Sequence, residues 1–197
     1  MPEPTEDATF RHDDWYAEDL ADRCFVRCEF FHVDLTEAVS RGAVFTECVF
    51  GNVAFNASRH ADSAFTRCVF KRCNLFEAEF TGCKLVGSSF EQCDLRPLRV
   101  DGGDWSFVAL PGADLRGVRL TDVRMREADL TGVDLTAATV TGVDLSGAQL
   151  HGARLLRADL RGSDLSALDP TTVQRAGALI DAEQAVLLAR ALGFQVG

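Results

Sequence analysis

A five-residue period runs through most of this 197-residue chain and restricts its possible folds more than any other feature. Every position divisible by five from Phe10 to Leu165 belongs to one ladder, and 30 of its 32 members are large and apolar. Ser40 and His60 are the two exceptions, and no insertion shifts the register. Two residues before each of these positions the side chain is nearly always small. Each unit of five therefore offers one large and one small side chain to a core.

A period of five fits neither a helix, with about 3.6 residues per turn, nor a strand, with a period of two, so it indicates a repeat architecture. One unit cannot bury its own apolar residue, and successive coils must stack to share a core. The repeated motif is Ala-(Asp/Asn)-Leu followed by two variable residues. It occurs in Ala113-Asp114-Leu115, Ala128-Asp129-Leu130 and Ala158-Asp159-Leu160. This pattern resembles that of the pentapeptide-repeat family.

The resemblance implies an all-β fold, a right-handed quadrilateral β-helix in which four units form one square coil. Residues twenty apart would then stack, and the 32 units would give about eight coils. We expect three segments along the chain. An acidic, disordered tail covers residues 1–7, the pentapeptide-repeat β-helix covers residues 8–167, and a helical cap and dimerisation segment covers residues 168–197.

Two short helices are predicted in the C-terminal segment. Asp169-Pro170 has the form of an N-cap followed by proline in the first turn, and Gly177 can close that helix. A second helix begins with Asp181 as N-cap and Gln184 three residues later, and it ends before Gly193. Its interior is apolar nearly all round, so one face can cover the open end of the β-helix while the other binds a second chain. The residues predicted to form this homodimer contact are Ile180, Ala185, Val186, Leu188, Ala189 and Leu192.

Charge and hydropathy indicate a compartment. The net charge is −10, from 20 Lys and Arg against 30 Asp and Glu, and most of it lies in residues 1–22. No apolar run is long enough to span a bilayer, and Met1-Pro2-Glu3-Pro4 is acidic where a secretory signal would be basic. We therefore expect a cytoplasmic protein with no membrane association.

The sequence offers little catalytic or metal-binding chemistry. Six of the seven cysteines lie on the small ladder, where free cysteine acts as a compact hydrophobe, and no CxxC pair supports a zinc site. His12 and His32 are twenty apart and should stack on the surface, whereas His60 is expected to be a half-buried member of the large ladder. The large side chains would fill the interior. We therefore predict no enzyme activity, no cofactor and no metal.

The surface remains as the candidate site. One column of the predicted β-helix repeats Asp or Asn at whole-coil intervals. These side chains can simply bond to turn backbone, because Asp or Asn at this position belongs to the motif. Alternatively, a negative and elongated surface presents itself to a protein site built for duplex DNA. The predicted partner-binding acidic surface consists of Asp14, Asp34, Glu37, Glu77, Asp94, Asp114 and Asp134.

Three segments resemble one branch of the family, the Qnr-like branch associated with fluoroquinolone resistance. They are Cys93-Asp94-Leu95-Arg96-Pro97-Leu98, Asp114-Leu115-Arg116-Gly117 and Asp181-Ala182-Glu183-Gln184-Ala185-Val186. The resemblance implies a dimeric rod that mimics DNA, binds and inhibits DNA gyrase, and protects it from quinolone-type poisons, with no direct binding of nucleic acid. The alternative hypothesis is a pentapeptide-repeat scaffold whose partner is not a topoisomerase.

Overall fold

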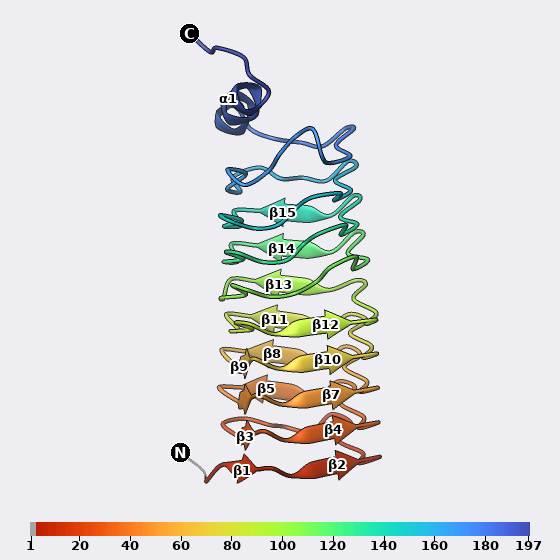
Figure 1. Ribbon diagram of the computed structural model, residues 1–197. Helices are drawn as coiled ribbons and strands as arrows, with labels where there is room; N and C mark the ends of the chain where they lie inside the picture. Colours follow the sequence, from red (N-terminus) through yellow and green to blue (C-terminus); the bar gives the residue numbers. More distant parts are fainter. Residues whose placement is uncertain (1–2) are drawn as a thin grey trace.

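The chain winds into a tall column of right-handed coils with its N-terminus at one end and its C-terminus at the other (Figure 1). A computed structural model describes residues 3–197. Parallel pairing joins residues twenty apart in sequence, as in Phe30 with Phe50 and Phe50 with Phe70. This spacing confirms the predicted β-helix with four repeat units per coil.

The column has four faces, which the chain visits in a fixed order. Three of them carry sheets, and we name these the four-stranded, five-stranded and six-stranded faces. The fourth face, which we name the bridge face, lies between the five-stranded and six-stranded faces. Its coils are joined by single β-bridges along the column from Asp14 to Gln174. The four-stranded face contains β1 (Thr5–Glu6), β3 (Cys24–Val26), β6 (Val44–Thr46) and β9 (Ala64–Thr66); the five-stranded face contains β2 (Thr9–Arg11), β4 (Glu29–Phe31), β7 (Val49–Gly51), β10 (Val69–Lys71) and β12 (Ser89–Glu91); the six-stranded face contains β5 (Val39–Arg41), β8 (Arg59–Ala61), β11 (Glu79–Thr81), β13 (Arg99–Asp101), β14 (Arg119–Thr121) and β15 (Thr139–Thr141).

The core consists of vertical stacks of side chains from the large ladder. On the five-stranded face the centroids of successive phenylalanine rings lie 5.0, 4.9, 4.8 and 4.6 Å apart. These distances match the spacing of about 4.8 Å between neighbouring strands, so the rings stack face to face with the coil repeat. The five stacked rings belong to Phe10, Phe30, Phe50, Phe70 and Phe90.

Two residues after each large ladder position the chain turns a corner of the column, and the backbone there restricts which residue types fit. The backbone is left-handed there, with φ of 58° at His12 and 55° at His32. Glycine adopts this conformation without strain, which accounts for Gly132 and its equivalents in the upper coils. The imidazole rings of His12 and His32 stack at 5.0 Å between centroids, as the twenty-residue spacing predicts.

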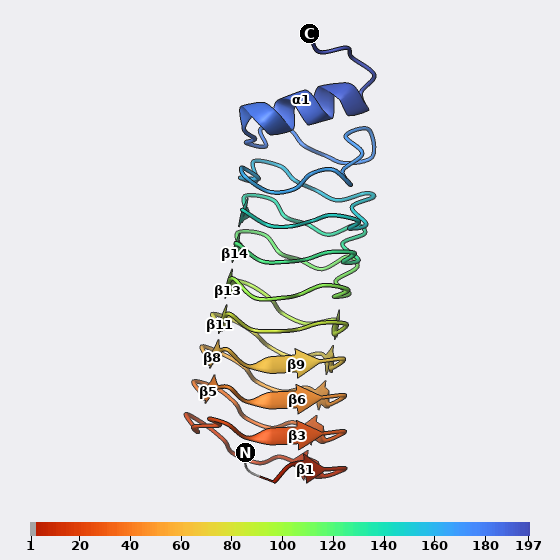
Figure 2. The same ribbon diagram turned by 90° about the vertical axis from the view of Figure 1, so that its left-hand side faces the viewer.

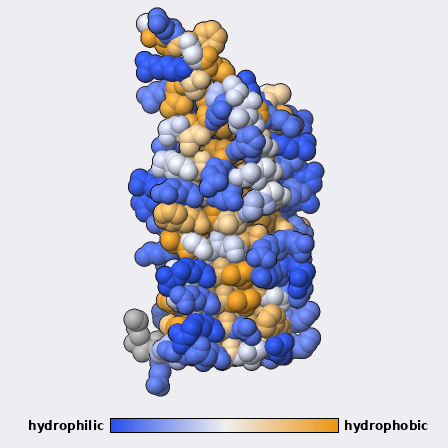
Figure 3. All heavy atoms as spheres, in the orientation of Figure 1, coloured by the Kyte–Doolittle hydropathy of each residue, from blue (hydrophilic) through white to orange (hydrophobic). Residues whose placement is uncertain are grey.

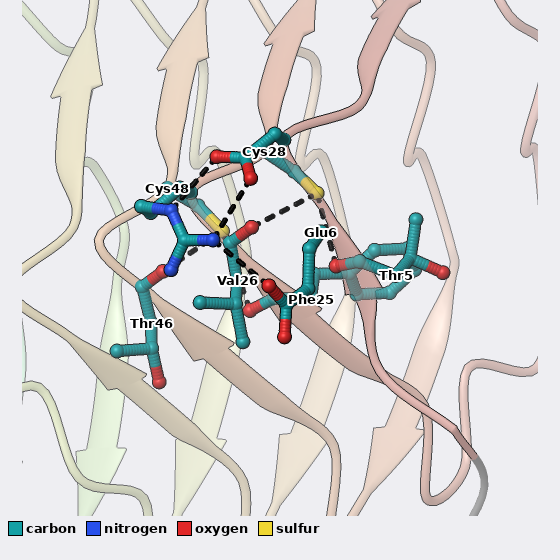
Figure 4. A network of polar contacts seen from close by, with 9 residues as sticks. Thr5, Glu6, Phe25, Val26, Cys28, Thr46 and Cys48 are labelled. Carbon is teal, nitrogen blue, oxygen red and sulfur yellow. Dashed lines mark hydrogen bonds and ion pairs between the residues drawn. The ribbon is translucent and has the colours of Figure 1, made fainter.

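The inward cysteines bond to backbone of the coil below. Figure 4 shows the Cys28 thiol donating to the Thr5 carbonyl, at 3.3 Å, and the Cys48 thiol donating to that of Phe25, at 3.6 Å. Burial raises the pKa of Cys28, and it raises that of Cys83 to about 11. The Cys28 and Cys83 thiols therefore stay protonated, and they act as the compact core residues that the pattern predicts.

The two exceptions to the large ladder form one buried polar network. Ser40 Oγ lies 2.8 Å from His60 Nδ1, and Ser58 Oγ lies 3.1 Å from His60 Nε2. Because Ser58 donates its own proton to the Phe55 carbonyl, Nε2 carries the imidazole proton and Nδ1 accepts one from Ser40. The expectation of a half-buried histidine is wrong, since His60 is 2% exposed. Because a serine hydroxyl bonds to each ring nitrogen, a neutral imidazole can occupy a core position that otherwise holds a large apolar side chain.

His60 should make the stability of the fold depend on pH. Burial lowers its pKa to about 3, well below the value of about 6.5 in an unfolded chain. Between these values the unfolded state binds the extra proton, so stability falls as the pH decreases through 6.5. The free energy of unfolding, measured by urea titration, should drop by about 2 kcal/mol from pH 7 to pH 5. A His60→Phe variant should not show this decrease in the free energy of unfolding. If the variant shows the same decrease, the other histidines cause it.

Both ends of the β-helix extend beyond the predicted boundaries. At the N-terminus β1 starts at Thr5 and pairs with β3. The segment 1–7, which was expected to be disordered, therefore already contains a strand. Residues 1 and 2 of that segment lie outside the described residues. At the C-terminus the coils continue to Leu179, which bridges to Asp159. The reason is that the ladders continue in register, with Leu168, Pro170 and Val173 all buried.

The C-terminal segment contains one helix within the described residues instead of the two predicted. Asp169 caps a turn of the last coil, accepting the Thr171 N–H at 2.8 Å, and no helix follows there. The second predicted helix is confirmed as α1 (Ala182–Ala191), with Asp181 and Gln184 forming a capping box. Figure 2 shows α1 lying across the end of the column, where it covers the last coil.

Candidate partner-binding surface

The acidic column on the bridge face has a structural role in the turns. Asp34 Oδ1 accepts the Thr36 N–H at 2.8 Å, and Asp134 Oδ1 accepts the Thr136 N–H at 2.9 Å. Asp14 does the same for Tyr16 at 3.0 Å. One carboxylate oxygen of each is thus used by the turn, as the motif predicts.

In the upper coils the carboxylates of this column are paired with arginines. Asp114 Oδ2 lies 2.7 Å from Arg116 Nη2 and 3.1 Å from Arg96 Nε, and Asp134 Oδ2 lies 3.7 Å from Arg154 Nε. The hydrogen bond from Arg116 holds the pKa of Asp114 below its ordinary value. These two members of the predicted acidic surface therefore lie within a locally balanced charge pattern.

In the lower coils the predicted acidic residues lack such partners. Among the described residues, no basic nitrogen lies within 4.0 Å of the other five carboxylates of the predicted surface. Five carboxylates without a basic partner thus lie on the bridge face and its corner with the six-stranded face, in roughly the first five coils. These five residues are Asp14, Asp34, Glu37, Glu77 and Asp94.

The neighbouring faces differ from this surface in charge and polarity. On the six-stranded face Glu79 lies 3.2 Å from Arg99 and 3.6 Å from Arg59, and a shallow hollow of about 530 Å³ extends over β5 and β8. The five-stranded face, seen in Figure 3, has apolar side chains along the middle of its lower half with hydrophilic ones on both sides. The outward residues there include the half-buried Val49 and Val69. In the described part of the chain, carboxylates without a basic partner also lie on the six-stranded face, at Asp19 and Asp101, so the acidic surface continues around the corner between these two faces.

Exposed aromatic side chains lie beside the acidic surface, and the sequence analysis missed them. Tyr16 is 53% exposed and Phe76 43% exposed, both at the corner between the bridge and six-stranded faces. Each directly follows a large ladder residue, at a position that points outward. The Glu37 carboxylate beside Tyr16 raises the pKa of that phenol. A large apolar residue at an outward position of the repeat was the signal that could have identified them.

The structure divides the six predicted dimerisation residues into two groups. Ile180 and Leu188 are partly buried against the end of the β-helix of their own chain, and Ala189 is also half-buried. Ala185, Val186 and Leu192 are exposed. Three further exposed apolar residues were not predicted. Leu179 precedes α1 in the sequence, and Phe194 and Val196 follow it.

One buried side chain fastens α1 to the column. Gln184 is 6% exposed, and its Nε2 donates to the carbonyls of Leu160 and Ser163 at 2.7 Å each. These are carbonyls of the last regular coil, which would otherwise have no strand above them. The capping box thus serves two purposes, since Gln184 both caps the helix and closes the sheet edge.

Within residues 3–197 no group of three or more His, Cys, Asp or Glu side chains is placed to hold a metal ion. In the same range, α1 is too short to cross a bilayer.

The repeat is recognised in comparisons with known families. Residues 106–136 and 128–166 match the family described as Pentapeptide repeats, and residues 43–119 match the Pentapeptide repeat region. Together these matches cover residues 43–166, which is 124 of the 197 residues. Both descriptions concern a repeat architecture and not a class of enzyme.

Individual proteins share this repeat. The chain is 41% identical over 114 residues to the pentapeptide repeat protein MfpA of Mycobacterium tuberculosis, a match that covers 55% of this chain and 51% of that protein. It therefore spans about half the length of the curated relative it matches. Full-length QnrB1, a plasmid-mediated fluoroquinolone resistance protein, superimposes with a TM-score of 0.61 at 20% identity, covering 98% of this chain and 100% of QnrB1.

A third protein shares only the fold. HetL, involved in regulating heterocyst differentiation in the cyanobacterium Nostoc sp. strain PCC 7120, has a TM-score of 0.53 at 20% identity, over 88% of this chain and 86% of HetL. At 20% identity the likeness to QnrB1 and to HetL establishes the coil architecture alone. Together with the matches over residues 43–166 and the twenty-residue pairing of the coils, it shows that the chain is a member of the pentapeptide-repeat family.

Proposed function

We propose that this protein binds DNA gyrase as a mimic of duplex DNA, inhibits it, and protects it from quinolone-type poisons. The observation that carries the proposal is the set of five unpaired carboxylates on one side of a straight rod. MfpA and the fluoroquinolone resistance protein QnrB1 support it as relatives in sequence and fold respectively. Such a role would be performed in the cytoplasm, the compartment predicted from the sequence.

The density of charge limits how closely DNA is imitated. Duplex DNA carries about one negative charge per 1.7 Å of its axis. The acidic surface offers at most one or two carboxylates per coil, and coils are about 4.8 Å apart. Binding to a DNA site should therefore depend on salt, but less steeply than the binding of DNA itself.

Gyrase supercoiling in the presence of the purified protein tests the proposal. Increasing amounts should inhibit the reaction, and in the presence of a quinolone fewer drug-stabilised cleavage complexes should form. Raising the salt concentration should weaken the inhibition. Normal supercoiling and an unchanged number of cleavage complexes at tens of micromolar protein would refute the proposal and favour a scaffold with another partner.

We also propose that the functional rod is a homodimer joined through its C-terminal segment. Val186, Leu192 and Phe194 leave apolar surface exposed beside a helix that is already fastened to its own column. A two-fold contact between two such surfaces would cover both at once. The resulting assembly would carry the acidic surfaces of two columns.

A double Val186→Glu, Leu192→Glu variant should be monomeric. Four carboxylates would face one another across the two-fold contact, and their desolvation would oppose association. Sedimentation velocity should show a dimer for the wild-type protein and a monomer for the variant, both with the same circular dichroism. The control is Glu183→Gln, an exposed change in the first turn of α1 that should leave the dimer intact. A dimeric double variant, or a monomeric wild type, would contradict the proposal.

A further inference from the structure

The corner between the bridge and six-stranded faces carries exposed apolar side chains, which a mimic of DNA charge does not require. Between residues 10 and 170, four large apolar side chains are exposed: Tyr16, Val39, Phe76 and Phe107. Tyr16 and Phe76 lie at the corner between the bridge and six-stranded faces, and Val39 lies on the adjoining strand β5. Single exposed hydrophobic residues are ordinary on protein surfaces, but three of the four lie along one corner of the rod and the strand beside it, which points to an interaction site.

Both aromatic rings are held in the same way. The Tyr16 N–H donates to Asp14 Oδ1 at 3.0 Å, and the Phe76 N–H donates to Asn74 Oδ1 at 3.0 Å. The backbone that carries each ring is thus fixed by a side chain of its own turn. Tyrosine and phenylalanine have only two side-chain torsions, so little entropy is lost when such a ring is immobilised in an interface.

The distance between the rings suits a protein interface. Sixty residues separate them, which is three coils, or about 14 Å along the rod at about 4.8 Å per coil. Glu37 and Glu77 follow one residue after the outward corner positions 36 and 76, so carboxylates lie beside both rings. The hollow of about 530 Å³ over β5 and β8 adjoins the corner, and its lining is of mixed charge, with Asp19 and Glu79 beside Arg41 and Arg59. The corner itself combines apolar projections with negative charge.

We propose that Tyr16 and Phe76 are apolar anchors that insert into pockets of a basic protein surface. This inference rests on the proposed function and deepens it: the partner surface is the DNA-binding part of gyrase, and it must offer small apolar pockets among its cations. DNA itself has no counterpart of these anchors on its backbone. They would let gyrase hold the protein by contacts that salt does not screen.

The opposite corner shows that exposed aromatic residues need not have this role. Phe107 is 54% exposed at the corner between the four-stranded and five-stranded faces, diagonally across the column. The charges at that corner are mostly paired, with Arg67 at 2.8 Å from Glu47 and Arg27 at 2.7 Å from Asp7. A basic partner would find no excess of negative charge there. Phe107 therefore provides a matched control.

Affinity for purified gyrase, measured at low and high salt, tests the proposal. Phe76→Ala and Tyr16→Ala should each weaken binding about tenfold at both salt concentrations, because a buried aromatic anchor typically contributes more than 1 kcal/mol. Tyr16→Phe, which keeps the ring, should bind like the wild type. Phe107→Ala should also bind like the wild type.

The possible outcomes separate the anchors from the mimicry. Wild-type affinity in both anchor variants, or an equal loss in Phe107→Ala, would overturn the anchors while leaving gyrase binding established. A loss that vanishes at high salt would also overturn them, since it would assign the effect to electrostatics. Absence of binding by the wild-type protein would overturn the proposed function and the anchors together.

Discussion

Replacing Gly103 by alanine is expected to destabilise the fold more than any other single-methyl change. A Cβ at this position would lie 2.1 Å from the carbonyl oxygen of Cys83 and 2.8 Å from its nitrogen, both rigid backbone atoms of the coil below. The backbone φ of 91° is also unfavourable for an L-residue. Overpacking costs about 1–3 kcal/mol and left-handed strain about 1–3 kcal/mol, so the free energy of unfolding should fall by roughly 2–6 kcal/mol.

The adjacent glycine is the control. Gly102 has a φ of 65°, and nothing lies within 4 Å of a Cβ built on it. Equivalent corner positions are occupied by Asp62 and Asp122 at φ of 49° and 53°. Gly102→Ala should therefore cost only about 1 kcal/mol. Urea unfolding of the two variants measures the difference, and similar midpoints would show that the coils can separate locally at little cost.

Removing three charges from the lower acidic surface should weaken inhibition of gyrase by about tenfold to a hundredfold. The variant combines Asp34→Asn, Glu37→Gln and Glu77→Gln. Asparagine keeps the acceptor that binds the Thr36 N–H, so the turn is preserved while the charge is lost. Three interfacial charge pairs at about 0.5–1 kcal/mol each sum to about 1.5–3 kcal/mol, and each 1.4 kcal/mol is a factor of about ten. The supercoiling assay measures the effect.

Three equivalent charges on other parts of the column provide the control. Glu29→Gln, Glu127→Gln and Asp129→Asn change the net charge by the same amount, and Asp129 caps its turn through the Thr131 N–H at 3.0 Å just as Asp34 does. This variant should inhibit gyrase nearly as well as the wild type. Equal weakening in both would mean that net charge alone drives binding. Undiminished inhibition by the first variant would remove the acidic surface from the mechanism.

The sequence predicted most of the fold because the constraint is periodic. One large and one small inward residue in every five fixes which side chains form the core, and the family resemblance supplied four units per coil. The start of α1 was also predictable, since Asp181 and Gln184 form a local capping box. The predicted ends of the β-helix were wrong because Thr5 and Pro170 continue the register of the large ladder without being large apolar residues. A strand edge accepts any residue that can pair or pack there.

The candidate site was predicted less completely than the fold. Asp114 and Asp134 have the same motif position as Asp34, yet their neighbours Arg96, Arg116 and Arg154 pair with them. Arg96 and Arg154 reach these carboxylates across neighbouring coils, whereas Arg116 pairs with Asp114 within one turn, and the period alone specifies neither contact. The exposure of Phe76 was likewise unrecognised until its corner position was known.

The sequence by itself determined the register, the contents of the core and the acidic column, because each follows from a residue's position within the repeat. The tertiary structure alone decided which carboxylates remain unpaired, which aromatic rings lie beside them, and that Gly103 must have no side chain. These properties depend on contacts between residues about twenty apart, across a gap of about 4.8 Å. Stacking brings those residues together, and the surface chemistry of the rod follows from which of them meet.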